Sequence, residues 1–313
     1  RLYGMPTHIS RLDPEYDWFF KTCAIKPATT WQAKDETTGK TFVVEPCCAH
    51  TPIGDLHVFR LDELFRSVPE LDGIYFDIMH VKNCDNELHG CGGVDAFGKH
   101  YTTSIALNLR DYVLRVLKTC QKYDRMFWLH AHNAFFPFVH DLADNWMPGE
   151  ELFAAIEKNP QWGYLEVISP EAYQSAWNSE VRGMSISCIG QLERITRILE
   201  LPESRMRDMR SDEYAVHALA PSILYDFMVV AMGSERQGHP VFKLWKIRKA
   251  VKLNDAEFHG YWIDPVASSV PAVKTSWYFW PKEAPQPFML CVVNTGRQPV
   301  KTGLKIDWEK LHS

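Results

Sequence analysis

Residues 73–79 read Gly-Ile-Tyr-Phe-Asp-Ile-Met, and residues 125–130 read Arg-Met-Phe-Trp-Leu-His. Both are short apolar runs that reach a polar side chain, which is typical of a buried strand whose carboxyl end borders a binding site. Between them, residues 104–123 carry apolar side chains at helical spacing. A strand, a crossover helix and a second strand predict parallel pairing and therefore an α/β fold.

Further runs extend this alternation along the chain. We predict additional strands and helices, the strands at residues 41–46, 163–168 and 184–189 and the helices at residues 191–201 and 214–232.

The pattern of residue types along the chain changes near Trp262. Residues 270–280 and 287–293 alternate and are rich in β-branched and aromatic side chains, and Asn294-Thr295-Gly296 supplies a turn. We therefore expect a parallel, barrel-like sheet in residues 1–255 and a small antiparallel β-sandwich-like domain in residues 256–313.

The composition excludes some partners. The chain has 313 residues, 46% of them hydrophobic and 23% charged, which is enough for a sizeable core in one or two domains. The net charge of -5 lacks the basic excess that a nucleic acid backbone requires. No run approaches the ~20 apolar residues that span a bilayer. We expect neither a nucleic acid partner nor a membrane span.

The eight cysteines lack paired C-x-x-C spacing, so we expect no structural zinc site. Cys84 and Cys91 flank a loop rich in Gly and Asn and could form a disulfide in an oxidising compartment. The alternative is that they are free thiols in and near the core. The sequence leaves both alternatives open.

Polar residues at strand ends are the first functional candidates, because ligands of α/β folds bind at the carboxyl ends of the strands. Asp77 follows an apolar run that desolvates it and precedes a long Gly-rich loop. The other strand-end side chains are Glu45, Glu166, His130, His132 and Asn133. For Glu45 and Glu166, capping a helix or pairing with Arg is an equal alternative.

Residues 141–151 read DLADNWMPGEE and concentrate carboxylates around a Trp. Asp144 and Glu150 could provide an acid and a base, and Trp146 could stack on a sugar ring. The structural alternative is a helix that begins at Pro148, with its acidic residues stabilised by the helix dipole and Trp146 packed beneath it.

His130-x-His132 also has the spacing of a metal-binding pair at a strand end, and a metal-dependent amidohydrolase is one alternative. We predict instead that these histidines, together with His89 from the Gly-rich loop, bind sugar hydroxyls, with no metal and no other cofactor. A carbohydrate-binding protein without catalysis is the other alternative.

Three segments in order resemble known enzymes: LDGIYFDIM, then NELHGCGGVDAFGKHYTTSIALNLRDYVLRVLK, then MFWLHAHNAFFPFVHDLADNWMPGEEL. Together they are similar to barrel glycoside hydrolases related to family 123, which share a strand ending in Asp, an H-G-C-G-like loop and an Asp-x-x-x-x-Gly-Glu-like segment. The resemblance covers roughly Gly54 to Leu201. It implies a (β/α)8 TIM-type barrel, incomplete at its N-terminal end in this chain, with further sequence of the same polypeptide upstream.

The resemblance carries over to Asp77, Asp144 and Glu150 by motif position. The family's adjacent Asp-Glu pair, which supports substrate-assisted cleavage, has no counterpart at a predicted strand end, so we do not transfer that mechanism. We expect a secreted or periplasmic glycoside hydrolase that cleaves a complex polysaccharide or glycan. Asp77 would be the nucleophile or base, and Asp144 or Glu150 the acid, with Glu166 a further catalytic residue. A carboxyl separation of ~5 Å would indicate retention, and one of about 6.5 to 9.5 Å inversion.

Overall fold

The computed structural model describes residues 2–27, 30–34, 38–131, 135–159, 162–179, 183–190, 204, 212–231, 239–263, 266–281 and 288–307. The chain divides into two compact units, residues 1–147 and 148–313. This boundary at Met147 is one that the sequence analysis does not predict. Both units combine helices with strands, which confirms the mixed α/β class.

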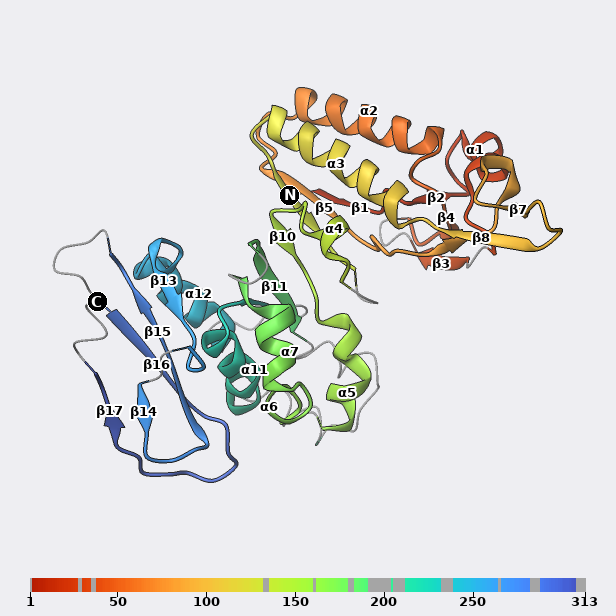
Figure 1. Cartoon of the computed structure of the whole chain (residues 1–313). Helices are drawn as coiled ribbons and strands as arrows, with labels where there is room; N and C mark the ends of the chain where they lie inside the picture. The colour runs from red at the N-terminus through yellow and green to blue at the C-terminus, as the bar shows by residue number, and fades with distance from the viewer. Residues whose placement is uncertain are drawn as a thin grey trace. The chain divides into compact units, whose positions relative to one another are not determined.

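The first unit alternates strands and helices along the chain (Figure 1). Its elements are β1 (Leu2–Gly4), β2 (His8–Ser10), α1 (Tyr16–Cys23), β3 (Trp31–Lys34), β4 (Thr41–Pro46), α2 (Pro52–Ser67), β5 (Gly73–Phe76), β6 (Asn83–Cys84), the 3₁₀ helix η1 (Glu87–His89), β7 (Gly92–Val94), β8 (His100–Ser104), α3 (Ala106–Lys122), β9 (Met126–Leu129), α4 (Pro137–His140) and β10 (Asn145–Trp146).

A parallel sheet forms the centre of the first unit, with strand order β1-β5-β9-β10. The register pairs Phe76 of β5 with Leu129 of β9, and Leu129 in turn with Trp146 of β10. The predicted parallel pairing of the runs at 73–79 and 125–130 is confirmed. Their carboxyl ends therefore meet at the same edge of the sheet.

One face of this sheet is buried. Ile74, Phe76, Phe127 and Leu129 are at most 5% exposed, and they share a face because side chains alternate along a strand. Helix α3 packs against β9, and α2 lies beside α3 (Figure 1). The helical spacing at residues 104–123 predicted α3 correctly.

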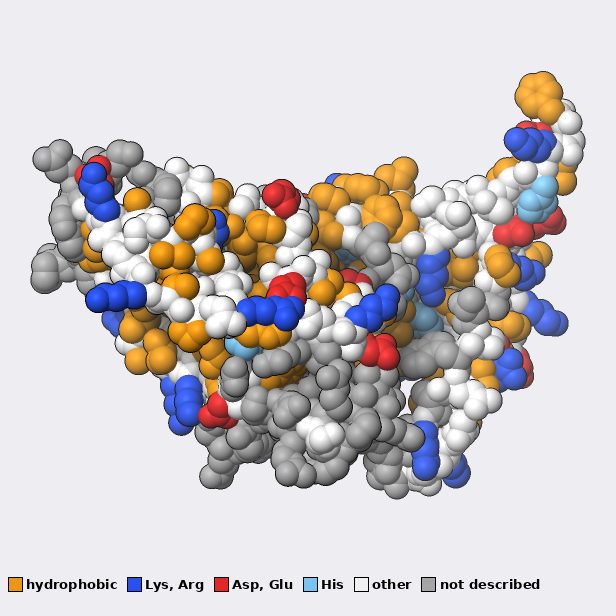
Figure 2. All heavy atoms as spheres, turned by 90° about the horizontal axis from the view of Figure 1, so that it is seen from below, with side chains coloured by type: hydrophobic (Ala, Val, Ile, Leu, Met, Phe, Trp, Pro, Cys, Tyr) orange, Lys and Arg blue, Asp and Glu red, His pale blue; other side chains and the backbone are white. Residues whose placement is uncertain are grey.

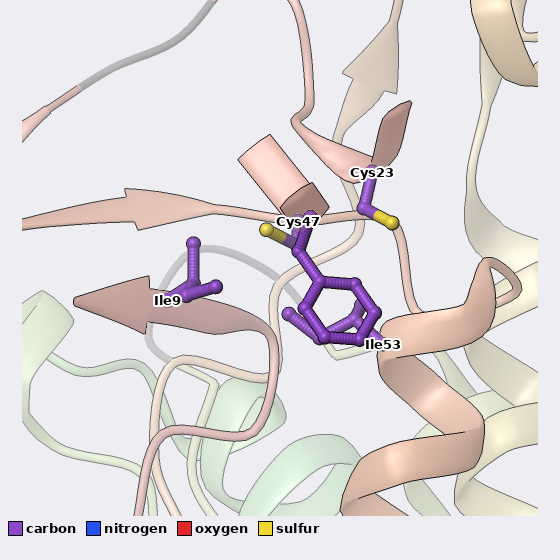
Figure 3. Close-up of a cluster of buried hydrophobic side chains, with 5 residues drawn as sticks. Ile9, Cys23, Cys47 and Ile53 are labelled. Carbon is purple, nitrogen blue, oxygen red and sulfur yellow. The ribbon is translucent and has the colours of Figure 1, made fainter. Parts of the chain in front are cut away.

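Strand β4 corrects one part of the fold prediction. It forms where the sequence predicts a strand, but it pairs antiparallel with β2 and β3 in a separate sheet. Figure 3 shows the small core beside this sheet, where Ile9, Cys23, Cys47 and Ile53 come together. The start of α2 fits closely against the preceding turn, since a Cβ at Gly54 would lie only 1.8 Å from the carbonyl oxygen of Ala49.

The second unit begins with helices and ends with antiparallel strands. Its elements are η2 (Glu150–Leu152), α5 (Phe153–Lys158), α6 (Gly163–Glu166), α7 (Pro170–Ala172), the π-helical η3 (Tyr173–Trp177), β11 (Ser185–Gly190), α11 (Asp212–Leu224), β12 (Met228–Ala231), α12 (Pro240–Ala250), η4 (Leu253–Asp255), β13 (Glu257–His259), β14 (Ala267–Ser268), β15 (Val273–Phe279), β16 (Phe288–Asn294) and β17 (Leu304–Lys305).

Two predictions in the second unit are wrong. Residues 163–168 were expected to form a strand, but Gly163–Glu166 form the helix α6. The amide of Val167 donates to the carbonyl of Gly163 at its end. The long helix expected at 214–232 ends at Leu224, and Asp226 has φ +53°, which turns the chain into β12. The helix expected at 191–201 lies outside the described residues.

The expected strands near the C-terminal end are confirmed. Strands β15 and β16 pair antiparallel over their whole length, with β13 on the other side of β15. The predicted strand at 184–189 is also present as β11, which pairs in parallel with β12. The turn at Asn294 follows β16, and its side chain accepts a hydrogen bond from the amide of Gly296.

The surface bears out the mixed charge of the sequence. On the face in Figure 2, acidic and basic side chains are scattered among hydrophobic and neutral ones. Among the helices that the structure describes, none has the length and apolar character needed to cross a membrane.

Candidate functional site

Asp77 lies at the carboxyl end of β5, where the parallel sheet of the first unit ends. Its Oδ1 is 2.7 Å from Nδ1 of His130, the residue that follows β9. Its Oδ2 accepts a hydrogen bond of 2.6 Å from the hydroxyl of Tyr3 in β1. The two strands that flank β5 therefore direct one polar side chain each to the carboxylate that follows β5.

The backbone after Asp77 is strained. Ile78 has φ +55°, a left-handed conformation that a β-branched residue rarely adopts. In this conformation the Ile78 amide donates a hydrogen bond of 2.8 Å to Oδ1 of Asp77. Strain of this kind costs about 1–3 kcal/mol and is concentrated at functional sites. The sharp turn thus contributes one of the donors that hold the carboxylate.

The hydrogen bonds decide the charge of Asp77. Burial by itself would raise the pKa of this carboxyl group, but the hydrogen bonds from His130 and Tyr3 outweigh burial and hold the pKa below its ordinary value. Asp77 is therefore ionised at neutral pH. Because an ionised carboxylate only accepts hydrogen bonds, Nδ1 is the protonated ring nitrogen of His130.

Asp77 and His130 differ in their exposure to solvent. The Asp77 side chain is 18% exposed, whereas that of His130 is 2% exposed. A ligand at the strand ends can therefore reach the carboxylate more readily than the imidazole. His130 donates to Asp77 and so orients the carboxylate.

Two aromatic side chains beside Asp77 were missed by the sequence analysis. The rings of Tyr3 and Tyr75 contact each other with centroids 5.6 Å apart, and Tyr3 is 53% exposed. Tyr75 comes two residues before Asp77, so strand alternation places it on the same side, and this pattern could have revealed it. Tyr3 belongs to a three-residue strand that gives almost no sequence pattern.

His8 is a further titratable neighbour of Asp77 that the sequence did not reveal, and Lys82 lies near His8. Burial, aided by the charge of Lys82, lowers the pKa of His8 to about 4, although Asp77 opposes this effect. His8 is therefore neutral at physiological pH. Burial likewise lowers the pKa of Lys82.

Asp144 and Trp146 occupy other environments. Asp144 precedes β10, and its carboxylate accepts a hydrogen bond of 2.7 Å from the amide of Phe127 near the start of β9. Asp77, in contrast, follows the end of β5. Trp146 is 4% exposed, and its ring packs 4.5 Å from that of Phe135. It is paired in register with Leu129 and so belongs to the buried face of the sheet.

Glu45 and Glu166 form ion pairs, as the structural alternative for each anticipates. Glu45 is 1% exposed and accepts hydrogen bonds from Arg11, at 2.7 Å, and from Tyr16. Glu166 lies on α6 rather than on a strand, and both of its oxygens accept from Arg297 at 2.6 Å. The hydrogen bond from Arg297 lowers the pKa of Glu166, although slight burial opposes it.

The remaining predicted residues divide into three cases. Glu150 begins η2 in the second unit and is half-buried. His132 and Asn133 lie outside the described residues. His89 does not join the Asp77 cluster in any described contact, because its Nε2 lies 3.3 Å from Sγ of Cys84 and its Nδ1 lies 2.6 Å from the carbonyl of Thr22.

Comparison of the sequence with protein-family models gives no match, and comparison with curated proteins gives none either.

Proposed function

We propose that this protein is a glycoside hydrolase in which Asp77 is the nucleophile or general base. The observation that carries the proposal is the ionised, partly exposed carboxylate at the carboxyl ends of parallel strands, held by Tyr3, His130 and the strained turn at Ile78. Glycosidases use such a carboxylate against an oxocarbenium-like transition state. Its low pKa suits a nucleophile or base and does not suit the general acid.

The aromatic pair beside Asp77 favours a sugar as the substrate. Sugars present apolar ring faces and hydroxyl edges, so their sites combine aromatic surfaces with polar side chains. Tyr3 and Tyr75 supply the aromatic surface, and Tyr3 also supplies a hydroxyl group. We propose that these tyrosines take the role that the sequence analysis gave to Trp146.

The parallel strands and the buried, helix-covered face are consistent with part of a (β/α)8 barrel, the fold that the resemblance to family 123 implies. On this proposal the substrate is a complex polysaccharide or glycan. The described contacts of Asp77 include no second carboxylate. Asp144 accepts from the amide of Phe127 near the start of β9, away from the strand end that carries Asp77, and Glu150 belongs to the other unit, so the proposal assigns neither as the general acid.

The test is the substitution Asp77→Asn, assayed on a panel of nitrophenyl glycosides and by release of reducing ends from soluble glycans. We expect the rate to fall by at least about 100-fold, because the amide cannot act as nucleophile or base. Asp111→Asn is the matched control, since Asp111 is an exposed residue on α3. Thermal unfolding of both variants checks the fold.

Two results would contradict the proposal. Wild-type rates in the Asp77→Asn variant would exclude Asp77 from the reaction. Binding of glycans without release of any product by the wild-type protein would instead support a carbohydrate-binding protein. If Asp77→Asn is inactive, Asp144→Asn and Glu150→Gln test the two acids expected from the sequence, because only the acid's loss is relieved by substrates with good leaving groups, and unchanged rates in both would exclude them.

A further inference from the structure

Three cysteines and one histidine meet in the first unit at a distance from the residues that hold Asp77. The three thiol sulfurs and one imidazole nitrogen of Cys48, Cys84, His89 and Cys91 all lie within 4.8 Å of one another. Tetrahedral zinc has Zn–S bonds of about 2.3 Å and Zn–N bonds of about 2.0–2.1 Å, so a cluster of this size needs only a small contraction to bind the ion. We propose that these four residues bind one structural zinc ion.

The histidine is already oriented as a ligand. Nδ1 of His89 lies 2.6 Å from the carbonyl oxygen of Thr22. A carbonyl oxygen only accepts hydrogen bonds, so Nδ1 carries the proton and Nε2 presents a lone pair. Nε2 lies 3.3 Å from Sγ of Cys84 and therefore faces the cluster. Metal-binding histidines are commonly held in this way by a carbonyl on the other nitrogen.

The backbone fixes the ligands on both sides of His89. The side chain of Asn86 donates to the carbonyl of Ala24 at 2.8 Å and accepts from the amide of Leu88 at 3.1 Å. Gly90 has φ +77°, a conformation that a side chain would disfavour, and it turns the chain from His89 to Cys91. The amide of Cys91 then donates to the carbonyl of Asn86.

Cys48 comes from a different part of the chain. It follows β4, and its amide donates a hydrogen bond of 2.8 Å to the carbonyl of Cys23 at the end of α1. Cys48 and Cys84 are 0% exposed and Cys91 is 2% exposed, and they pack with Ile25 and Ile105. Four protein ligands in a closed, largely dry environment indicate a structural site, because a catalytic zinc keeps one position open for water.

The zinc site explains all four side chains together. A disulfide between Cys84 and Cys91 would use two sulfurs and leave Cys48 and the oriented His89 without a common role. Zinc instead would join the segment after β4 to the loop that contains β6, η1 and β7. The three thiols would lose their protons to the solvent as the ion binds.

The experiment uses the full chain, purified under reducing conditions, stripped of metal and titrated with Co²⁺. We expect one Co²⁺ per chain, the absorption bands of tetrahedral thiolate-bound cobalt, and their loss when Zn²⁺ displaces it. His89→Ala removes a half-buried ligand at small cost to the core. This substitution should weaken Co²⁺ binding by more than about 10- to 100-fold, which is the effect of losing a residue that only hydrogen-bonds to a metal ligand.

Cys84→Ser should abolish the cobalt bands, and Cys120→Ser is its matched control. Cys120 is also 0% exposed, but it lies on α3 outside the cluster, so this variant should still bind one ion per chain. Absence of the cobalt bands in the reduced wild-type chain would overturn the proposal. An equal loss of the cobalt bands in the Cys84→Ser and Cys120→Ser variants would also overturn it. A Cys84–Cys91 disulfide in metal-free native protein, detected by mass spectrometry, would do the same.

Discussion

The charge of Asp77 depends on donors that come from three separate segments. The hydroxyl of Tyr3 is the donor that can be removed with least disturbance, because Tyr3 is 53% exposed and its ring contacts Tyr75 independently of the hydroxyl. His130 and the amide of Ile78 would remain as donors to the other oxygen. This arrangement permits a direct test of how the carboxylate is kept ionised.

We predict that Tyr3→Phe raises the pKa of Asp77 toward its ordinary value. The proposed reaction needs ionised Asp77, so activity is present above this pKa and is lost as pH falls through it. The acidic limb of the pH profile of kcat/KM should therefore move to higher pH, while the rate above neutral pH falls by less than about 10-fold. Tyr101→Phe on β8 is the control. An unshifted acidic limb in the Tyr3 variant would show that Asp77 does not set it.

At this scale the sequence predicted that Asp77 and His130 lie at the same edge of one sheet, because each follows an apolar strand and parallel strands bring their carboxyl ends together. It could not predict that Trp146 is buried, since an aromatic residue suits a core as well as a sugar site. His89 was assigned to sugar binding because it lies in the Gly-rich loop after Asp77, and a zinc site was not expected because the cysteines lack paired C-x-x-C spacing. The fourth member of that cluster, Cys48, is distant in sequence.

Helix α3 offers a test of how much its buried side chains contribute to the stability of the first unit. Leu109 is 0% exposed and lies on the buried side of the helix, whereas Leu107, two positions earlier, is 69% exposed. The two residues have the same intrinsic helix propensity, so their replacement by alanine differs only in packing. They form a matched pair on one helix.

We predict that Leu109→Ala lowers the free energy of unfolding of the first unit by about 2–5 kcal/mol, through lost burial and the cavity that remains. Leu107→Ala should change it by no more than about 0.5 kcal/mol. Urea unfolding followed by circular dichroism, together with hydrogen exchange of the α3 amides, measures both changes. Similar effects of the two substitutions would mean that α3 does not pack as described.

Long helices with regular apolar spacing were predicted better than short segments. The helix at 104–123 has several turns of regular apolar spacing, so its type was clear. Residues 163–168 form a six-residue, mostly apolar segment that contains Glu166, and such a short segment fits a helix turn or a strand equally well. Similarly, the sequence predicted β4 as a strand, but its antiparallel partners depend on tertiary pairing that a local pattern does not specify.

At the scale of the whole chain, the sequence predicted antiparallel strands near the C-terminal end, and β13, β15 and β16 confirm them, but it did not predict the antiparallel sheets β2-β4-β3 and β6-β8-β7 of the first unit. It did not predict the division at Met147, because the Pro148-Gly149 pair that follows is also typical of a local turn or the start of a helix. Compact units depend on which side chains pack together. Such packing involves residues far apart in sequence, as the cluster of Cys48 with Cys84 and Cys91 shows.

The proposed zinc ion should make the stability of the first unit depend on the concentration of free zinc. A ligand that binds the folded chain and not the unfolded chain stabilises it by about 1.4 kcal/mol for each tenfold rise in free ligand above the Kd. In zinc buffers, the unfolding free energy of the first unit should therefore rise with the logarithm of free zinc. His89→Ala should require higher zinc concentrations before the same rise begins, while Cys120→Ser should begin to rise at the wild-type concentration. A wild-type stability that is independent of zinc would show that the four residues do not bind the ion in the folded chain.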